Sequence, residues 1–194
     1  MTVHCATTNQ GKIAEFTSAA SPDLSIQPLP GLAAIPPCDE TGSTFEENAI
    51  QKALYYGLYS DGWLFAEDSG LEVDALDGAP GVYSARFAGE GATDAANNAL
   101  LLERLAESDV RTARYVCVIA LVLRGELQEC FRGTVEGEIL RELRGDNGFG
   151  YDPLFYYAPF GCSFGEVSRE RKQTISHRGA ALRLLSNRLK PSLR

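Results

Sequence analysis

Short apolar runs alternate with polar turns at the start of the chain. Residues 3–7 are apolar enough to form a strand, and residues 13–20 are expected to form a helix after the polar turn between them. Residues 25–29 can form a second strand, and the proline-rich stretch 28–37 indicates an irregular connection. The pattern predicts a strand, a loop, a helix and a second strand in that order.

Three further helices are predicted from their caps and their apolar faces. Thr44 and Glu47 have the spacing of a capping box, and the following helix keeps one face apolar through Phe45, Ala49, Ala53 and Leu58. Thr93 can cap another helix, which is lined on one side by Ala96, Leu100, Leu101 and Leu105. A last amphipathic helix is expected over residues 176–189, with a buried stripe of Leu182, Leu185 and Leu189.

The second half of the chain contains a predicted β-hairpin. Residues 111–123 form a long apolar run that ends at Arg124-Gly125, and residues 126–137 can pair back along it. A hairpin pairs its strands antiparallel, so the sheet is expected to be mixed rather than purely parallel. Helices and a mixed sheet in one chain place the protein in the α/β class.

The densest group of carboxylates lies in residues 65–89, FAEDSGLEVDALDGAPGVYSARFAG. Residues 63–66 resemble a buried strand, so the turn Glu67-Asp68-Ser69-Gly70 is expected to follow its end, with a second short strand over residues 71–73. A buried carboxylate needs hydrogen-bond donors, a cationic partner or a metal ion, because its desolvation is costly. The alternative is an acidic turn that only caps a neighbouring element.

Composition bounds the class of protein. The 194 residues suit one domain, which can have two lobes, and the hydrophobic fraction of 44% is that of a globular protein. The net charge of −8 argues against a module that binds a nucleic-acid polymer, because an acidic chain gains little from counterion release. Anionic small molecules stay possible if a metal ion accompanies them.

The cysteines and the N-terminus indicate a cytoplasmic protein. The five cysteines are scattered, odd in number and without a Cys-x-x-Cys pair, so neither a disulfide framework nor a zinc site is expected. Cys5 and Cys117 lie in apolar runs and are predicted to be reduced core residues. No signal segment and no run of about 18 apolar residues is present, which argues against export and against a membrane span.

A first candidate site follows the first predicted strand. Between that strand and the helix lie Thr7, Thr8, Asn9, Gln10, Gly11 and Lys12. Backbone N–H groups, small hydroxyls and a helix dipole favour an anion there, and Lys12 supplies a positive charge. A phosphate is the natural ligand, although the loop lacks the second glycine and the Lys-Ser or Lys-Thr pair of a Walker loop. The alternative is a turn that carries a surface lysine.

Glu40 is a candidate metal ligand. It precedes the capped helix in a loop, whereas Glu46 and Glu47 open that helix and are read as compensation of its dipole. Glu40 and Asp68 together can hold one magnesium ion, because Mg²⁺ takes one or two carboxylates, waters and substrate oxygens.

A glycine-rich aromatic loop is a candidate base-binding segment. Its residues are Gly148, Phe149, Gly150, Tyr151, Asp152 and Pro153. An aromatic ring can stack on a flat base, which contributes about 1–3 kcal/mol, and Asp152 can accept hydrogen bonds from ring N–H groups. The alternative is core packing at a loop.

Cationic and donor groups gather near the last helix. Lys172 precedes it, and His177 and Arg178 follow Ser176 at its start, where they favour the oxygens of a base or a phosphate. The alternative is a core histidine with a solvated arginine. Arg86 is equally ambiguous.

Taken in order, five blocks resemble the family of inosine and xanthosine triphosphate pyrophosphatases, which remove deaminated purine nucleotides. The blocks are TTNQGKIAEF, ETGSTFEENAIQKA, AEDSGLEVDALDGAPGVYSARFAG, GFGYDPLF and SHRGAAL, and together they span the chain. The family commonly has glycine in place of Thr8 and two aspartates in place of Glu67 and Asp68. The longer arm of Glu67 leaves its distance to a metal open, whereas Asp68 is unchanged.

The resemblance implies a two-lobed α/β fold with an elongated mixed sheet, a nucleotide cleft between the lobes, magnesium dependence and a homodimer. By motif, Thr7 to Lys12 would hold the triphosphate, Asp68 would be the catalytic acceptor and metal ligand, Ser69 would touch substrate and Glu40 would assist the metal. The base and phosphate pocket would be lined by Phe149, Gly150, Tyr151, Asp152, Lys172, His177 and Arg178. Asp74 and Asp77 are expected to be structural.

We therefore expect magnesium-dependent hydrolysis of ITP, dITP or XTP to the monophosphate and pyrophosphate. Water would attack the α-phosphorus with Asp68 as its base, and Lys12 and Lys172 would stabilise phosphate oxygens. Donors at His177 and Arg178 would select the 6-oxo edge and reject ATP. The alternatives are a purine-nucleotide-binding regulator without catalysis and a phosphatase that acts on other modified nucleotides.

Overall fold

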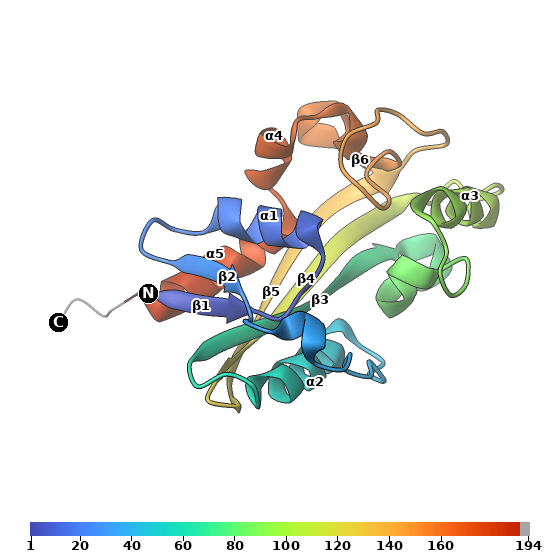
Figure 1. The fold of residues 1–194 in the computed structure, drawn as a ribbon. Coiled ribbons are helices and arrows are strands. Elements are labelled where there is room, and N and C mark those ends of the chain that lie inside the picture. Colours follow the sequence, from blue (N-terminus) through green and yellow to red (C-terminus); the bar gives the residue numbers. More distant parts are fainter. Residues whose placement is uncertain (191–194) are drawn as a thin grey trace. The chain divides into compact units, whose positions relative to one another are not determined.

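Residues 1–190, which the computed structural model describes, form a mixed sheet of seven strands in the order β2-β1-β3-β4-β5-β6-β7 (Figure 1). In chain order the strands are β1 (Thr2–Cys5), β2 (Ser25–Pro28), β3 (Trp63–Val73), β4 (Thr112–Leu123), β5 (Glu126–Ile139), β6 (Phe155–Tyr157) and β7 (Cys162–Ser163). β1 is parallel to β2 and β3, whereas β6 is antiparallel to β5 and β7. The predicted mixed α/β sheet is confirmed.

Three of the five α-helices in residues 1–190 begin where the sequence predicts, whereas the first begins three residues earlier than expected and the fourth was not expected. The five are α1 (Gln10–Ala19), α2 (Phe45–Gly57), α3 (Asp94–Arg104), α4 (Arg169–Gln173) and α5 (His177–Leu189). The side chains of Thr44, Thr93 and Ser176 each accept a backbone N–H from the first turn of α2, α3 and α5. None of the helices within the described residues is long and apolar enough to cross a membrane.

The chain divides into two compact units. Unit 1 contains Met1–Asp68, Cys117–Gly133 and the segment from Ser176 onward, and unit 2 contains Ser69–Val116 and Thr134–Ile175. β3, β4 and β5 therefore each contribute residues to both units. The two units agree with the predicted two lobes, and the nucleotide cleft between the lobes stays a prediction.

Each unit has its own hydrophobic core. In unit 1, α1 and α5 cover one face of the sheet and α2 covers the other (Figure 1). The core under α1 and α5 includes Val3, Cys5, Phe16, Ile26, Phe65, Cys117, Ile119, Leu121, Leu182 and Leu185. The core of unit 2 is rich in aromatic rings and includes Leu71, Leu101, Tyr115, Tyr151, Leu154, Phe155 and Phe164. Buried apolar area of this kind supplies most of the driving force for folding.

One prediction about the backbone is wrong in an informative way. Glu67, Asp68, Ser69 and Gly70 do not form a turn, because they lie inside the continuous strand β3. Gly70 is needed there for a close approach: a Cβ at Gly70 would lie 2.3 Å from Ser84 Oγ and 2.7 Å from Gly81 O. Glycine in this sequence therefore indicates tight packing on a strand and not a reversal of the chain.

A second correction concerns the phosphate loop. The helix starts at Gln10, so Gln10, Gly11 and Lys12 form the first turn of α1 and not the loop before it. Asn9 is the N-cap, and its Oδ1 accepts the backbone N–H of Lys12 at 3.1 Å. The loop proper is therefore short, and Lys12 is carried by a helix.

Candidate functional site

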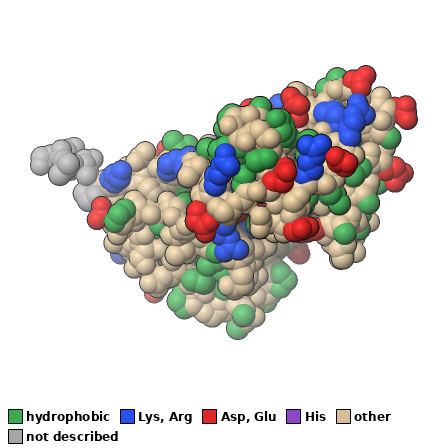
Figure 2. Space-filling model, turned by 90° about the horizontal axis from the view of Figure 1, so that it is seen from above, with side chains coloured by type: hydrophobic (Ala, Val, Ile, Leu, Met, Phe, Trp, Pro, Cys, Tyr) green, Lys and Arg blue, Asp and Glu red, His purple; other side chains and the backbone are tan. Residues whose placement is uncertain are grey.

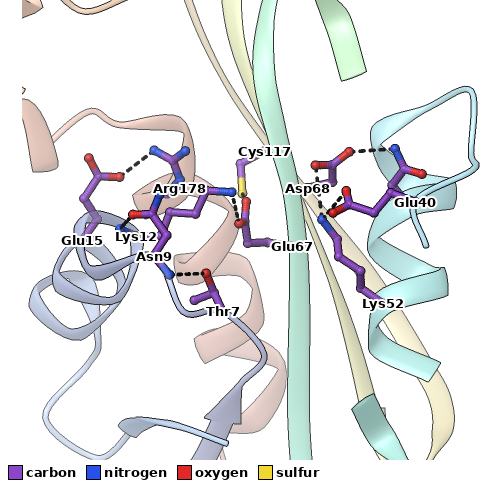
Figure 3. A network of polar contacts seen from close by, with 11 residues as sticks. Thr7, Asn9, Lys12, Glu15, Glu40, Lys52, Glu67, Asp68, Cys117 and Arg178 are labelled. Carbon is purple, nitrogen blue, oxygen red and sulfur yellow. Dashed lines mark hydrogen bonds and ion pairs between the residues drawn. The ribbon is translucent and has the colours of Figure 1, made fainter. Parts of the chain in front are cut away.

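Glu67 and Asp68 project from β3 to opposite sides (Figure 3). Successive side chains alternate across a strand, so the two carboxylates have different neighbours. Both residues are buried, with 5% of Glu67 and 8% of Asp68 exposed. Each carboxylate must therefore be compensated by polar groups on its own side.

Glu67 is compensated by Lys12 of α1. Lys12 Nζ lies 2.5 Å from Glu67 Oε1, and the thiol of Cys117 lies 4.0 Å from Glu67 Oε2 (Figure 3). Burial raises the pKa of Glu67, but the positive charges of Lys12, Arg178 and Lys52 outweigh burial and lower that pKa to about 2. Glu67 is therefore ionised at neutral pH.

Arg178 is part of the same buried network. Its Nη1 donates to Glu15 Oε2 of α1 at 2.8 Å, and both side chains are almost fully buried. Burial lowers the pKa of Arg178, but the charges of Glu15 and Glu67 outweigh it and raise the pKa. Glu15 thus fixes one side of the guanidinium, a role that the sequence did not suggest for a residue within a predicted helix.

Asp68 faces α2 on the other side of β3. Asn48 Nδ2 donates to Asp68 Oδ2 at 3.1 Å, and Lys52 Nζ lies 3.4 Å from Asp68 Oδ1 and 2.8 Å from Glu40 Oε2. Burial raises the pKa of Asp68, and the negative charges of Glu67 and Glu40 add to burial, against the opposite effect of Lys52. A buried carboxylate with a raised pKa is a better proton acceptor than an exposed one.

A pocket of about 300 Å³ lies beside these groups within unit 1. Its polar lining comes from Thr7, Thr8, Lys12, Glu40, Lys52, Tyr56 and Glu67. The residue after β1, Ala6, donates its backbone N–H to Phe65 O of β3 at 2.9 Å. From there β3 continues beyond the end of β1, its parallel neighbour. Two lysines and two threonine hydroxyls in one hollow are suited to an anionic ligand.

Two acidic side chains next to Lys52, those of Asp68 and Glu40, could supply the protein ligands of a magnesium ion. No group of three or more His, Cys, Asp or Glu side chains within residues 1–190 is arranged to hold a metal. Asp68 and Glu40, however, both direct an oxygen at the same cationic Nζ of Lys52 (Figure 3). Two convergent carboxylates match the one or two that Mg²⁺ takes from protein when phosphate oxygens and waters complete its shell.

The aromatic loop lies in unit 2 and is organised by Asp152. Asp152 Oδ2 accepts from Lys172 Nζ at 2.6 Å and from the backbone N–H of Phe149 at 3.0 Å, and Tyr115 Oη donates to Oδ1 at 3.2 Å. Lys172 Nζ also lies 5.1 Å from the centre of the Phe149 ring, within cation–π range. The predicted loop residues and Lys172 are thus brought together.

The remaining predicted residues are divided between the units. His177 and Arg178 begin α5 in unit 1, and both are buried. Ser69 belongs to unit 2, as does Arg86, whose Nε lies 3.8 Å from the exposed Glu90. Asp74 pairs with Arg114 at 3.0 Å, in agreement with its expected structural role.

Sequence reasoning missed Lys52 and Asn48. The two residues are four positions apart and lie on the face of α2 that also carries the buried residues Phe45 and Ala49. Polar residues on the otherwise apolar face of a predicted helix are the signal that could have identified them. Asn48 and Lys52 are needed because Asp68, on the strand beneath, would otherwise be buried without a partner.

On the face drawn in Figure 2, basic and acidic side chains are interspersed. This face therefore presents no continuous positive field of the kind that binds a nucleic-acid backbone.

Comparison with known proteins gives consistent matches over nearly the whole chain. The model of the Ham1 family matches residues 3–188. A dITP/XTP pyrophosphatase of Exiguobacterium sibiricum is 49% identical over 95% of this chain and 95% of its own, and one of Listeria monocytogenes is 46% identical over 95% and 92%. The solved structure of the Staphylococcus aureus Ham1 protein superposes with a TM-score of 0.88, at 43% identity and 98% coverage of both chains.

Proposed function

Because this chain belongs to the Ham1 family, we propose that it hydrolyses non-standard purine nucleoside triphosphates, namely dITP, ITP and XTP, to the monophosphate and pyrophosphate. The observation that carries the proposal is the pocket of unit 1, which is lined by both Lys12 and Lys52, together with Asp68, a buried carboxylate with a raised pKa whose Oδ1 lies 3.4 Å from Lys52 Nζ. Cations for a triphosphate and a base for water therefore lie together.

The reaction is an in-line displacement at the α-phosphorus. Asp68 accepts a proton from water as the oxygen attacks, the bond from the α-phosphorus to its bridging oxygen breaks, and pyrophosphate leaves. Lys12 and Lys52 stay protonated and bind phosphate oxygens as negative charge shifts to the leaving group. Asn48 holds the Asp68 carboxylate in place through its hydrogen bond.

Magnesium belongs to the proposal, with Asp68 and Glu40 as its protein ligands. When bound, the ion would neutralise charge on the triphosphate and on the leaving pyrophosphate. Lys52, which bridges Asp68 and Glu40, would then turn toward the phosphates. Thr7 and Thr8 line the same pocket and can donate to phosphate oxygens, while Asn9 orders the start of α1; Gln10, Gly11 and Ser69 complete the proposed substrate contacts.

The base is assigned to two groups of residues. Phe149, Gly150, Tyr151 and Asp152, with Lys172, are proposed to contact the purine in unit 2, where the loop is held as one network. His177 and Arg178 of unit 1 are proposed to donate to its 6-oxo edge. A site built to hydrogen-bond one group can reject an analogue without it by about 10⁴-fold, which would exclude ATP.

Two further parts of the proposal are a homodimer, which the family resemblance supports, and a cytoplasmic location, which the free and partly buried cysteines support. Size-exclusion chromatography with light scattering tests the first. Fractionation of the source cells tests the second.

The decisive experiment is phosphorus NMR of the products from ITP, XTP, GTP and ATP, with Mg²⁺ and after EDTA. We expect inosine or xanthosine monophosphate and pyrophosphate, slow turnover of ATP, and loss of both products in EDTA that added Mg²⁺ restores. Orthophosphate as the first product would support the phosphatase alternative. Binding of ITP without turnover would support the regulator.

A further inference from the structure

Helix α3 clamps the backbone of Gly150 through both its N–H and its carbonyl. Asp94 Oδ2 accepts the backbone N–H of Gly150 at 2.6 Å, and Asn98 Nδ2 donates to the carbonyl of Gly150 at 2.9 Å. Asp94 and Asn98 are four residues apart and share one face of α3. Two side chains from a distant part of the sequence thus fix a single residue of the aromatic loop.

Gly150 needs such support because of its backbone conformation. Its φ of +63° lies in the left-handed region, which glycine enters freely but does not prefer by itself. Asn98 is 4% exposed, and its Oδ1 has no hydrogen-bond partner among the described residues. The bond to Gly150 O therefore orients the Asn98 amide, and water has little access to replace that bond.

Gly150, the residue that Asp94 and Asn98 clamp, lies at the centre of the aromatic loop. Phe149 precedes Gly150 and donates its N–H to Asp152, and Tyr151 follows it and donates its hydroxyl to the carbonyl of Ser84 at 2.8 Å. A rotation at Gly150 would move the Phe149 ring relative to the Asp152 carboxylate. The clamp therefore acts on the spacing of the residues assigned to the base.

Asn97 provides a matched comparison beside Asn98. It is equally buried, at 3% exposure, and it also holds a loop: its Nδ2 donates to Ala85 O at 3.2 Å and its Oδ1 accepts from Ala88 N at 2.9 Å. Among the described residues, the Asn97 side chain bonds Ala85 and Ala88 and does not reach residues 148–152. Loss of Asn97 removes buried hydrogen bonds from the same helix without releasing Gly150.

We propose that Asp94 and Asn98 are positioning residues that determine how tightly and how selectively the aromatic loop binds a purine base. The inference rests on the proposed function, because it needs that loop to contact the base. The groups assigned to phosphate chemistry lie in unit 1 and α3 lies in unit 2, so loss of the clamp affects base binding far more than the chemical step.

The test compares four variants by steady-state kinetics on ITP and ATP. We expect Asp94→Ala and Asn98→Ala each to raise KM for ITP by about 10-fold, the loss of one well-placed hydrogen bond, with kcat within about 3-fold of wild type and poorer discrimination against ATP. Asp94→Asn keeps an oxygen that can accept from Gly150, and it should restore most of the KM. Asn97→Ala should leave KM within about 2-fold, although it removes two hydrogen bonds.

Hydrogen exchange of the Gly150 amide is the second readout and does not depend on activity. Asp94→Ala should accelerate this exchange. Asp94 is exposed, so its loss leaves the core intact, and this variant keeps the test valid if Asn98→Ala folds poorly. An active wild-type protein with unchanged KM in Asp94→Ala and Asn98→Ala would overturn the inference alone. A folded wild-type protein that hydrolyses none of the nucleotides would instead overturn the proposed function.

Discussion

Glu67 and Asp68 are consecutive residues whose carboxylates are neutralised by different lysines, Lys12 for Glu67 and Lys52 for Asp68. The alternation of side chains along β3 causes this separation, because it directs one carboxylate toward α1 and α5 and the other toward α2. The two acids can therefore have distinct roles: Glu67 holds Lys12 in place, and Asp68 is left to the reaction. Substitution of Asp68 should therefore lower activity, whereas substitution of Glu67 should mainly change stability.

Asp68→Asn should lower kcat on ITP by about 100-fold or more, because an amide cannot accept the proton of the attacking water. The fold should persist, since the amide is nearly the same size as the carboxylate and its one oxygen can still accept from either Asn48 or Lys52. Circular dichroism and steady-state kinetics check both statements. Asp74→Asn, which changes an exposed carboxylate of the same segment, is the control and should retain activity; near wild-type turnover in Asp68→Asn would refute the assigned role.

Lys12→Met should destabilise the fold by about 3–5 kcal/mol, because it leaves the Glu67 carboxylate buried beside one fewer cation. Adding Glu67→Gln to Lys12→Met should recover part of the loss, since the buried charge is then removed with its partner. Urea unfolding of the single and double variants measures the coupling. Equal destabilisation by Lys12→Met and by the double variant would contradict the ion-pair account.

Stability should fall at acid pH through Glu67. The pKa of Glu67 is about 2 in the folded protein and about 4.5 as its ordinary value, so the folded state binds the proton less readily than the unfolded state. The contribution is fully present above pH 4.5 and is lost as pH falls toward 2, and it amounts to about 3 kcal/mol. Urea unfolding at several pH values checks it, and Glu67→Gln should flatten that part of the profile.

Gly148→Ala should weaken ITP binding by about 10-fold or more, because the new Cβ would lie 2.0 Å from Asp152 Oδ2 and would displace the carboxylate that organises the aromatic loop. Gly161→Ala is a matched control. Gly148 and Gly161 both have positive φ, +80° and +69°, but a Cβ at Gly161 meets nothing within 4 Å. Both variants should therefore lose about 1 kcal/mol of stability to backbone strain, and only Gly148→Ala should raise KM. A similar KM in the two variants would contradict the clash.

The sequence predicted the parts of the site that depend on local pattern. Lys12 was expected near the phosphates and Glu40 near the metal ion, and both line the pocket of unit 1. The predicted turn at Glu67 was wrong because Asp-Ser-Gly is common in turns, whereas here Gly70 allows a close approach to Ser84. That error also hid the alternation that sends Glu67 and Asp68 to different partners.

Contacts between distant segments could not be predicted in this way. The bond from Asn98 to Gly150 joins residues 52 positions apart, and the pair of Arg178 with Glu15 joins residues 163 apart. Such pairings depend on how the strands are ordered in the sheet, which one sequence does not reveal. The role of a polar residue on a helix, such as Asn98 or Glu15, can therefore be assigned only when its partner in a distant segment is known.

The thiol of Cys117, which lies beside Glu67, can report on opening of the sheet in unit 1. Cys117 has no exposed surface, and burial together with the charge of Glu67 raises its pKa well above the ordinary value, so it is a protonated and shielded sulfur at neutral pH. Alkylating reagents attack thiolates, and they can reach this one only after β4 has separated from its neighbours. The rate at which Cys117 is alkylated therefore measures how often the sheet opens, without the introduction of a new cysteine.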